Sequence, residues 1–331
     1  MRADSPGIDD LDRRIVERLR ANGRETNRSL AQALGVNEAT IAARLRRLEA
    51  ENIVHIVALT DMEGLGFDFF AFAMVKVADR SASEVGRSMA AIPEVISVTV
   101  ATGRYDIIAA VLAREREDLG RLIGAVIPKI RGVDSVRCEF AVEVLRYDSE
   151  WAALRASTNA PPPPQPELTA EVVDDLDLAI IRALQRDARS SNRRIAAELD
   201  VSEGTIRQRL RRLEDEQFVR IRAVSDVEAF GLTAYATVGV HVRGGAVEAV
   251  GKALIDIEGV AAIIRSLGEF DFVLIVVAES RQLLIETILA RIQVIKGVRA
   301  TETFEVAGTL KHVYTWVRLL EQPARGDRSQ S

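Results

Sequence analysis

The 331-residue sequence is poor in the residues that most often carry chemistry. It holds one cysteine and three histidines, and aromatic residues make up 5% of it. The single Cys138 excludes an internal disulfide and a cysteine-cluster metal site, and the three histidines (His55, His241 and His312) lie far apart in the chain. We therefore expect no metal and no cofactor, and neither a metalloenzyme nor a cysteine–histidine hydrolase.

Long apolar runs and an excess of positive charge are also missing. No run reaches the roughly 18 apolar residues of a membrane-spanning helix, and the start of the chain (residues 1–6) lacks the apolar centre of a signal peptide. With 48% hydrophobic residues, a soluble cytoplasmic protein is expected. A net charge of −5 argues against non-specific coating of nucleic acid, because proteins that do this are usually basic.

The chain is an internal duplication. A residue of the first half has its counterpart 165 positions later, without gaps from Asp9 to about Tyr147. Between residues 9–56 and 174–221, 24 of 48 positions are identical. Prolines at 161–164 and at 166 interrupt the repeat, and such a run favours an extended, semi-rigid spacer. We therefore expect two copies of one unit joined by a linker.

One stretch, residues 37–49, returns almost unchanged as 202–214. Each copy opens with a helix N-cap residue, and its apolar residues form one narrow helical stripe. The other positions are small, polar or arginine, which suits a helix that reads the major groove of DNA. An ordinary solvated helical face is the alternative interpretation. The residues expected to contact DNA are Asn37, Ala39, Thr40, Ala42, Ala43, Arg44, Arg46, Arg47, Ser202, Gly204, Thr205, Arg207, Gln208, Arg209, Arg211 and Arg212.

The periodicity predicts an α+β fold. Two short amphipathic segments precede each repeated helix, so that three helices with a tight turn before the last form a helix-turn-helix. Strand-like runs then alternate with helical stretches in the order strand, helix, strand, strand, helix, strand. The predicted fold is a duplicated unit of a three-helix (winged-type) helix-turn-helix domain followed by a ferredoxin-like βαββαβ sandwich. The runs are 53–59, 69–77, 95–102, 107–112 and 133–145 for strands and 82–92 and 115–130 for helices.

These features resemble the Lrp/AsnC family of bacterial and archaeal transcription regulators. The matching elements are Leu11-Asp12 with Ile15, Leu30-Ala31 with Gly35-Val36, the helix at 40–49 and the turn Gly103-x-Tyr105-Asp106. The resemblance implies that double-stranded DNA and a small effector, typically an amino acid, are the partners, and that the chain forms a dimer or tetramer. The implied boundaries are 8–60 and 173–225 for DNA-binding domains, 66–148 and 231–320 for effector-sensing domains, 149–172 for the linker and 321–331 for a flexible tail.

A covalent tandem departs from the family pattern, because one chain supplies what is ordinarily a homodimer. The face opposite the apolar stripe also differs between the two repeated helices. Arginine pairs with guanine and glutamine with adenine, whereas alanine contacts only a thymine methyl group. We predict that the second unit carries most of the base readout and that the operator is asymmetric. The differing faces are Ala39, Ala42, Ala43 and Arg46 in the first unit and Gly204, Arg207, Gln208 and Arg211 in the second.

In the family the effector lies between paired sensing domains near the glycine–aspartate turn. Arg104-Tyr105 in the first turn corresponds to Glu269-Phe270 in the second, so two pockets should not bind one ligand equally. One interpretation is that Arg104 binds a carboxylate group of the effector and Glu269 an amino group. The alternative is that both are solvent-facing residues of a tight turn. Cys138, the counterpart of Thr303, is expected to be a small buried core residue. The effector contacts implied by the resemblance are Gly103, Arg104, Tyr105, Asp106, Gly268, Glu269, Phe270, Asp271, Thr301 and Thr303.

Two other functions stay open. Siroheme decarboxylases are built from the same tandem domains, but they carry aromatic and asparagine residues at the turn and use histidine and arginine in the pocket. Here both turns keep glycine and aspartate, and no histidine lies near them in sequence. The second alternative is an architectural DNA-binding protein that responds to no effector. We expect a regulator, with no catalytic residues.

Overall fold

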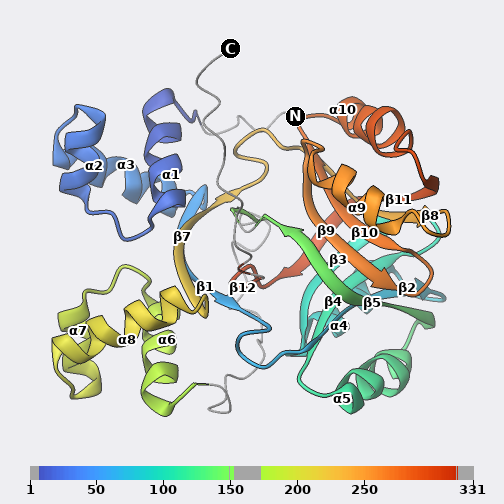
Figure 1. Cartoon of the computed structure of the whole chain (residues 1–331), viewed down its shortest axis with the longest axis horizontal. Helices are drawn as coiled ribbons and strands as arrows, with labels where there is room; N and C mark the ends of the chain where they lie inside the picture. Colours follow the sequence, from blue (N-terminus) through green and yellow to red (C-terminus); the bar gives the residue numbers. More distant parts are fainter. Residues whose placement is uncertain (1–6, 149, 153–172, 318, 320–331) are drawn as a thin grey trace.

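Two helix-turn-helix domains lie at one end of the molecule and a β-barrel lies at the other (Figure 1). The structure is a computed structural model that describes residues 7–148, 150–152, 173–317 and 319. A small sheet stands between the helical domains and the barrel. Among the described residues, no helix is long and apolar enough to span a membrane. Most of the predicted linker (149–172) and the predicted tail (321–331) lie outside the described residues.

Both helix-turn-helix domains form as the sequence predicts. The second helix of each ends at a residue in the left-handed conformation, Gly35 (φ 70°) or Asp200 (φ 53°), which sets the tight turn. Apolar side chains at helical spacing, such as Ile41, Leu45 and Leu48, are buried in the core of each domain. The helices are α1 (Asp10–Ala21), α2 (Asn27–Leu34) and α3 (Glu38–Ala50) in the first unit, and α6 (Asp175–Arg186), α7 (Asn192–Leu199) and α8 (Glu203–Asp215) in the second.

The strand after each helix-turn-helix pairs with its counterpart from the other unit. β1 (Val54–Asp61) and β7 (Val219–Asp226) are antiparallel neighbours at the centre of a four-stranded sheet. The edge strands are β12 (Trp316–Val317) and β6 (Trp151–Ala152), so Trp151 and Ala152 belong to this sheet, although they fall within the predicted linker. Each first helix packs on the strand of the other unit, α1 on β7 and α6 on β1. The two units therefore share one framework.

Gly23 of the first unit lies directly against the backbone of the second unit. Its backbone N–H donates to the carbonyl oxygen of Ile221 at 3.0 Å. A Cβ atom at position 23 would lie 2.8 Å from the same backbone, closer than real Cβ atoms approach. Ala223 and Ala229, both from the second unit, complete the core of the first helix-turn-helix domain. Neither unit on its own contains all of its core.

The two sensing domains close into one eight-stranded barrel. Each contributes an antiparallel four-stranded sheet, and the last strand of each unit pairs with an edge strand of the other, β5 with β9 and β11 with β3. The inner faces of the sheets meet in the barrel interior, and the helices cover the outer faces (Figure 1). The elements are β2 (Phe69–Val77), α4 (Ala82–Ala90), β3 (Val95–Thr102), β4 (Ile107–Ala113), α5 (Arg116–Arg121) and β5 (Val133–Tyr147), and then β8 (Ala234–Val242), α9 (Val247–Ile255), β9 (Val260–Leu267), β10 (Phe272–Ala278), α10 (Arg281–Glu286) and β11 (Val298–His312).

Candidate DNA-binding and effector sites

Several residues predicted to contact DNA cap the N-termini of the recognition helices α3 and α8. The Asn37 side chain accepts hydrogen bonds from the Thr40 backbone N–H at 2.7 Å and from the Thr40 hydroxyl at 2.9 Å. In the second unit, Ser202 Oγ accepts the Thr205 backbone N–H at 3.0 Å. These caps satisfy donors that a helix start leaves unpaired. Each cap residue is exposed, so a cap and a phosphate contact can coexist.

Four of the predicted DNA-contacting arginines form ion pairs within their own domain. Arg44 and Arg47 both bind the carboxylate of Asp12, with Nη···Oδ distances of 3.2 and 2.5 Å, and Asp12 is fully buried. The second unit repeats the arrangement, with Asp177 as the buried carboxylate. These pairs fix each recognition helix against the first helix of its domain. The arginines involved are Arg44, Arg47, Arg209 and Arg212.

The face that remains open toward solvent differs between α3 and α8. On α3 the exposed side chains are Ala39, Ala43 and Arg46, with Ala42 half-buried. On α8, Arg207, Gln208 and Arg211 are exposed and line a shallow groove that begins at Gly204. Arg207 pairs with Glu203 at 2.8 Å on the surface, a contact too weak to prevent the side chain from turning to a base.

Two equivalent arginines clasp the helix-turn-helix domains together. Arg24 of the first domain donates to the Ser190 carbonyl oxygen and to Asn192 Oδ1 of the second, both at 2.9 Å. Its counterpart Arg189 donates back to the Glu25 carbonyl oxygen at 2.9 Å and to Asn27 Oδ1 at 3.1 Å. Both contacts reach the start of the second helix of the opposite domain. The clasp thus joins the two helix-turn-helix domains directly, in addition to the sheet that they share.

The double substitution Arg24→Ala and Arg189→Ala should loosen the spacing between α3 and α8. We expect operator affinity to fall by about tenfold or more, because each domain must then be ordered separately when it binds. The affinity should also depend less on the separation of the half-sites, which a titration of operators lengthened or shortened by two base pairs would measure. Arg14→Ala removes the same charge from the exposed side of α1 and is the control. An unchanged preference for half-site separation in the double variant would contradict the role of the clasp.

The two glycine–aspartate turns meet at one end of the barrel. Arg104 of the first turn binds Glu269 of the second at 3.0 Å and Glu302 of β11 at 2.7 Å. The Tyr105 hydroxyl donates to Glu269 Oε2 at 2.5 Å. The Glu302 carboxylate raises the pKa of Arg104, and burial together with Glu269 raises the pKa of Tyr105. The sequence predicted that Arg104 and Glu269 each contact the ligand or each face solvent. In the structure the two side chains form an ion pair with each other.

The aspartate of each turn has a structural task. Asp106 accepts the backbone N–H of Val77 at 2.9 Å and binds Lys76 at 3.1 Å. Asp271 accepts the backbone N–H of Val242 at 2.7 Å. Each carboxylate thus ties its turn to the end of the neighbouring strand. The repeated spacing of glycine and aspartate indicated the turn, but the strand whose backbone N–H group the aspartate accepts could not be identified from the sequence.

Each turn also meets a different residue from the opposite unit. Gly268 packs on Glu139, a buried carboxylate of β5 that accepts the backbone N–H groups of Glu269 at 2.7 Å and Phe270 at 3.1 Å. Burial raises the pKa of Glu139, and the two N–H donors oppose that shift. The counterpart of Glu139 is Phe304, which packs on Gly103 instead. The sequence comparison did not single out this difference.

The remaining predicted effector residues lie elsewhere. Thr301 and Thr303 pair with Val240 and Val238, whose side chains pack under the outer helices, so the register places both threonine side chains on the outer face of the barrel. The Arg104 cluster lies on the other side of that strand. Cys138 is half-buried rather than fully buried, and burial raises the pKa of its thiol to about 11. The described residues contain no group of side chains suited to hold a metal ion.

Family models cover both units. An AsnC-type helix-turn-helix model matches residues 8–49, a winged helix-turn-helix model matches 173–220, and the Lrp/AsnC ligand-binding domain matches twice, at 70–151 and 235–315. The chain belongs to the Lrp/AsnC family. The HTH-type transcriptional regulator FL11 of Pyrococcus furiosus is 28% identical over 144 residues, which cover 43% of this chain and 95% of the relative. FL11 of Pyrococcus horikoshii is 30% identical over 132 residues, covering 39% and 87%.

A solved structure is similar to this Lrp/AsnC tandem over most of its length. The siroheme decarboxylase NirDL superposes with a TM-score of 0.64 and covers 92% of this chain and 93% of its own, at 19% identity. At that identity the likeness shows a common fold. The structure also places His241 beside the second turn, 5.1 Å from the Phe270 ring, a proximity that the sequence did not indicate.

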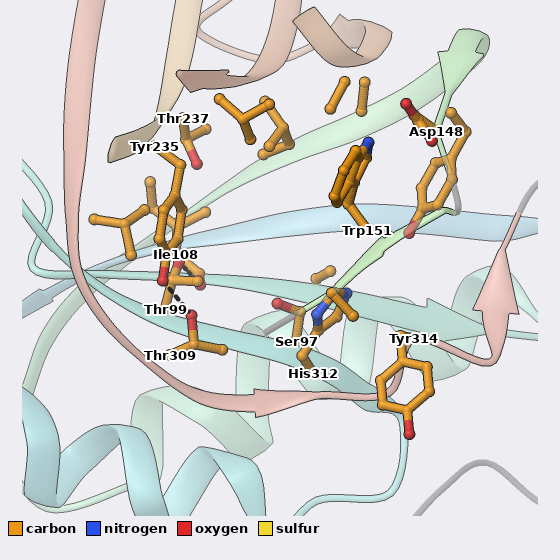
Figure 2. A pocket seen from close by; sticks show the side chains of 18 of the residues that line it. Ser97, Thr99, Ile108, Asp148, Trp151, Tyr235, Thr237, Thr309, His312 and Tyr314 are labelled. Atoms are coloured by element: carbon orange, nitrogen blue, oxygen red, sulfur yellow. Dashed lines mark hydrogen bonds between the residues drawn. The ribbon is translucent and has the colours of Figure 1, made fainter. Parts of the chain in front are cut away.

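A cavity of about 170 Å³ lies inside the barrel of this Lrp/AsnC protein (Figure 2). Both units line it, and its wall extends to Trp151, Val227 and Val317 at the sheet that joins the helix-turn-helix domains. His312 contributes its imidazole to the wall, and burial lowers the pKa of this ring to about 4. The titratable neighbours lining the same space are Tyr147, Asp148, Tyr235 and Tyr314.

The buried imidazole predicts a pH-dependent stability. Because the pKa of His312 falls from 6.5 in the unfolded chain to about 4 in the folded one, only the unfolded chain takes up this proton between those values. Acidification therefore lowers stability, by up to about 3 kcal/mol for this group. Urea unfolding at pH 7, 5.5 and 4.5 should show that His312→Gln loses less stability than the wild type. A difference between the two proteins that is the same at every pH would contradict this assignment.

Proposed function

We propose that the protein is a sequence-specific transcription regulator in which one chain acts as a pseudo-dimer on an asymmetric operator. The observation that carries the proposal is the clasped pair of helix-turn-helix domains with unlike open faces. The Arg24 and Arg189 contacts fix the pair, so both recognition helices can engage one DNA segment at once. The half-sites should then lie one helical turn, or a multiple of it, apart.

The two open faces support unequal roles in recognition. Arg207, Gln208 and Arg211 on α8 offer bidentate donors and acceptors to base edges, whereas α3 offers alanines and Arg46. A helix such as α3, with few groups that can bind base edges, contacts phosphates and selects DNA by its shape. One half-site should therefore be strictly specified and the other loosely.

A stoichiometry measurement with the full chain tests the pseudo-dimer. We expect one chain to protect both half-sites, and we expect each half-site alone to bind at least about tenfold more weakly, because linked domains gain effective concentration. Analytical ultracentrifugation of the protein with a fluorescent operator gives the ratio of chains to DNA. Two chains required for one pair of half-sites, or equal affinity for unrelated DNA, would overturn the proposal.

For the effector we propose an amino acid bound at the Arg104 cluster. A guanidinium beside the carboxylates of Glu269 and Glu302 matches the carboxylate and ammonium groups of a zwitterion. A ligand that exchanges with these internal pairs can alter how the two turns meet. The opposite position, between Glu139 and the second turn, already has its backbone N–H groups occupied, so one effector per chain is expected.

A melting screen of the amino acids tests this part. A true effector at a hundredfold excess over its Kd stabilises the protein by about 2.7 kcal/mol, and Arg104→Ala should abolish that shift. Arg121→Ala, which removes an exposed arginine paired only with Asp118, is the control. If no amino acid shifts the melting temperature while operator binding persists, the architectural function replaces the effector-responsive one.

The whole-chain likeness to a siroheme decarboxylase makes catalysis the second candidate. The barrel cavity is close in size to one that accommodates benzene, so it suits a single ring and not a four-ring macrocycle. The relatives named as regulators support DNA binding instead. Incubation with siroheme should release no carbon dioxide above the protein-free rate, and turnover would reverse the assignment.

We also propose that tandem chains associate through the second sensing domain. Ile285, Leu289 and Val294, at and after α10, are exposed by 40%, 53% and 68%. Their first-unit counterparts are Gly120, Gly124 and Lys129, which offer no such apolar surface. Light scattering should detect a dimer or tetramer that Leu289→Asp reduces to the single chain, and a monomeric wild type would contradict this.

A further inference from the structure

The barrel cavity exists because the two units place unlike side chains at equivalent positions. The first unit has Phe72 where the second has Thr237, and the second has Ile275 where the first has Ala110. All four side chains line the cavity, so each small residue leaves unfilled a position that its counterpart fills. A symmetric pair of units with the larger residue at both positions would close much of this space. The cavity is therefore a product of divergence between the copies.

The wall is apolar, with a few polar groups that lack partners. Thr237 is 2% exposed, Ser97 and His312 are half-buried, and the hydrogen bonds among the described residues include none to the side chains of these three. In Figure 2 the Tyr235 hydroxyl points away from Thr237 and toward Thr309, to which it is bonded at 3.0 Å, while His312 and Trp151 lie farther along the cavity. Polar groups that line a cavity and have no protein partner can bind a ligand that hydrogen-bonds to them.

The electrostatics of the cavity disfavour anionic ligands. Among the described residues, no lysine or arginine lines it, and Asp148 is the one carboxylate. The low pKa of His312 keeps that ring neutral at neutral pH. Moving a carboxylate from water into a space without a positive charge is costly. The amino-acid zwitterion expected at the Arg104 cluster therefore does not belong here.

We propose that this cavity is a second ligand site, which binds one uncharged, single-ring molecule carrying a hydroxyl group. Its volume of about 170 Å³ is close to the roughly 150 Å³ of an engineered apolar cavity that stays dry and binds benzene. The ring fills the space between Phe72 and Ile275, and the hydroxyl group meets Thr237, Ser97 or His312. This site does not depend on DNA binding or on the Arg104 cluster.

The position of the cavity gives its ligand access to the DNA-binding half. Val227 directly follows β7, Trp151 lies on β6, and Val317 ends β12, all in or beside the sheet that joins the helix-turn-helix domains. A molecule bound in the cavity therefore lies in a space that the barrel and these three residues enclose together. A ligand in the cavity can therefore affect the four-stranded sheet that joins the helix-turn-helix domains carrying α3 and α8.

Phenol is the probe for the test, with benzoate and phenylalanine as charged comparisons of similar ring size. Calorimetry on the full chain should show one phenol per chain with a Kd on the order of 0.1–1 mM, an affinity accessible to so small a ligand. Benzoate and phenylalanine should compete with phenol at least tenfold more weakly. Phenol should also raise the melting temperature.

Two filling substitutions and one control assign the binding to this cavity. Thr237→Phe and Ala110→Ile each introduce the residue that the other unit already carries, and each should weaken phenol binding by at least tenfold. Ala307→Ile adds the same bulk as Ala110→Ile at an exposed position of β11 and should leave binding unchanged. If Thr237→Phe fails to fold, Ala110→Ile still decides the question. Absence of phenol binding up to 10 mM, binding equal to that of benzoate, or binding that survives a folded filling variant overturns the proposal.

Discussion

Replacing Arg207, Gln208 and Arg211 of α8 together by alanine should reduce operator affinity by at least about 100-fold and remove most discrimination between sequences. Each good bidentate contact contributes about 1–3 kcal/mol of discrimination, and one factor of ten in affinity corresponds to about 1.4 kcal/mol. All three side chains are exposed on one face, and none is held by a buried partner. Fluorescence anisotropy with the preferred operator and with a scrambled duplex measures both effects.

Arg46→Ala on α3 is the matched comparison. Arg46 is exposed at the position equivalent to Arg211, so the same charge is removed from the same place on the other recognition helix. We expect DNA affinity to fall by roughly 3- to 10-fold for all sequences alike. The slope of log affinity against log salt concentration should decrease by about one. An Arg46→Ala variant that loses sequence discrimination as fully as the α8 variant would contradict the unequal roles of the two helices.

Asp12→Ala should be the most destabilising single substitution in the first helix-turn-helix domain. Its fully buried carboxylate joins α1 to Arg44 and Arg47 of α3. Removing it takes the buried partner from two guanidinium groups, and breaking a buried pair costs about 3–5 kcal/mol. Arg44 keeps its exposed partner Asp9, and Arg47 keeps Glu51 at 3.5 Å, which places the expected loss at the lower end. Because both arginine side chains are 32% exposed and can turn to water, about 3 kcal/mol is expected.

Urea unfolding measures that effect, and Asp10→Ala is its control. Asp10 lies in the same first turn of α1 but is exposed. It should change stability by less than about 0.5 kcal/mol, as surface substitutions usually do. Asp177→Ala should repeat the large effect in the second domain, where Asp177 is equally buried. Equal stabilities of Asp12→Ala and Asp10→Ala would show that the ion pairs do not hold the recognition helix.

Local signals in the sequence were sufficient to predict most elements of both units, although the short edge strands β6 and β12 were not predicted. Cap residues, apolar spacing and the left-handed ends at Gly35 and Asp200 predicted the helices, and the period-two runs predicted the strands to within about two residues. Because the sequence is duplicated, each of these patterns occurs in both units and supports the same element twice. The resemblance to the Lrp/AsnC family rested on the same residues, and the matches of the family models confirm it.

Contacts between the units could not be predicted in the same way. That β1 pairs with β7, or that Arg24 reaches Ser190, depends on how two distant segments pack, which no local period records. The ion pairs of Arg44 and Arg47 depend on the crossing of α1 and α3. The residue facing each turn, Glu139 or Phe304, became apparent only when the barrel closed.

The asymmetry of the operator is the central claim, and binding-site selection with the full-length chain tests it most directly. Random duplexes enriched over several rounds should yield two unlike half-sites. The half-site read by α8 should be strictly defined, and the one read by α3 should be loosely defined. Enrichment of a perfect palindrome would contradict the claim, because it would mean that the two helices read DNA equally despite their different exposed faces.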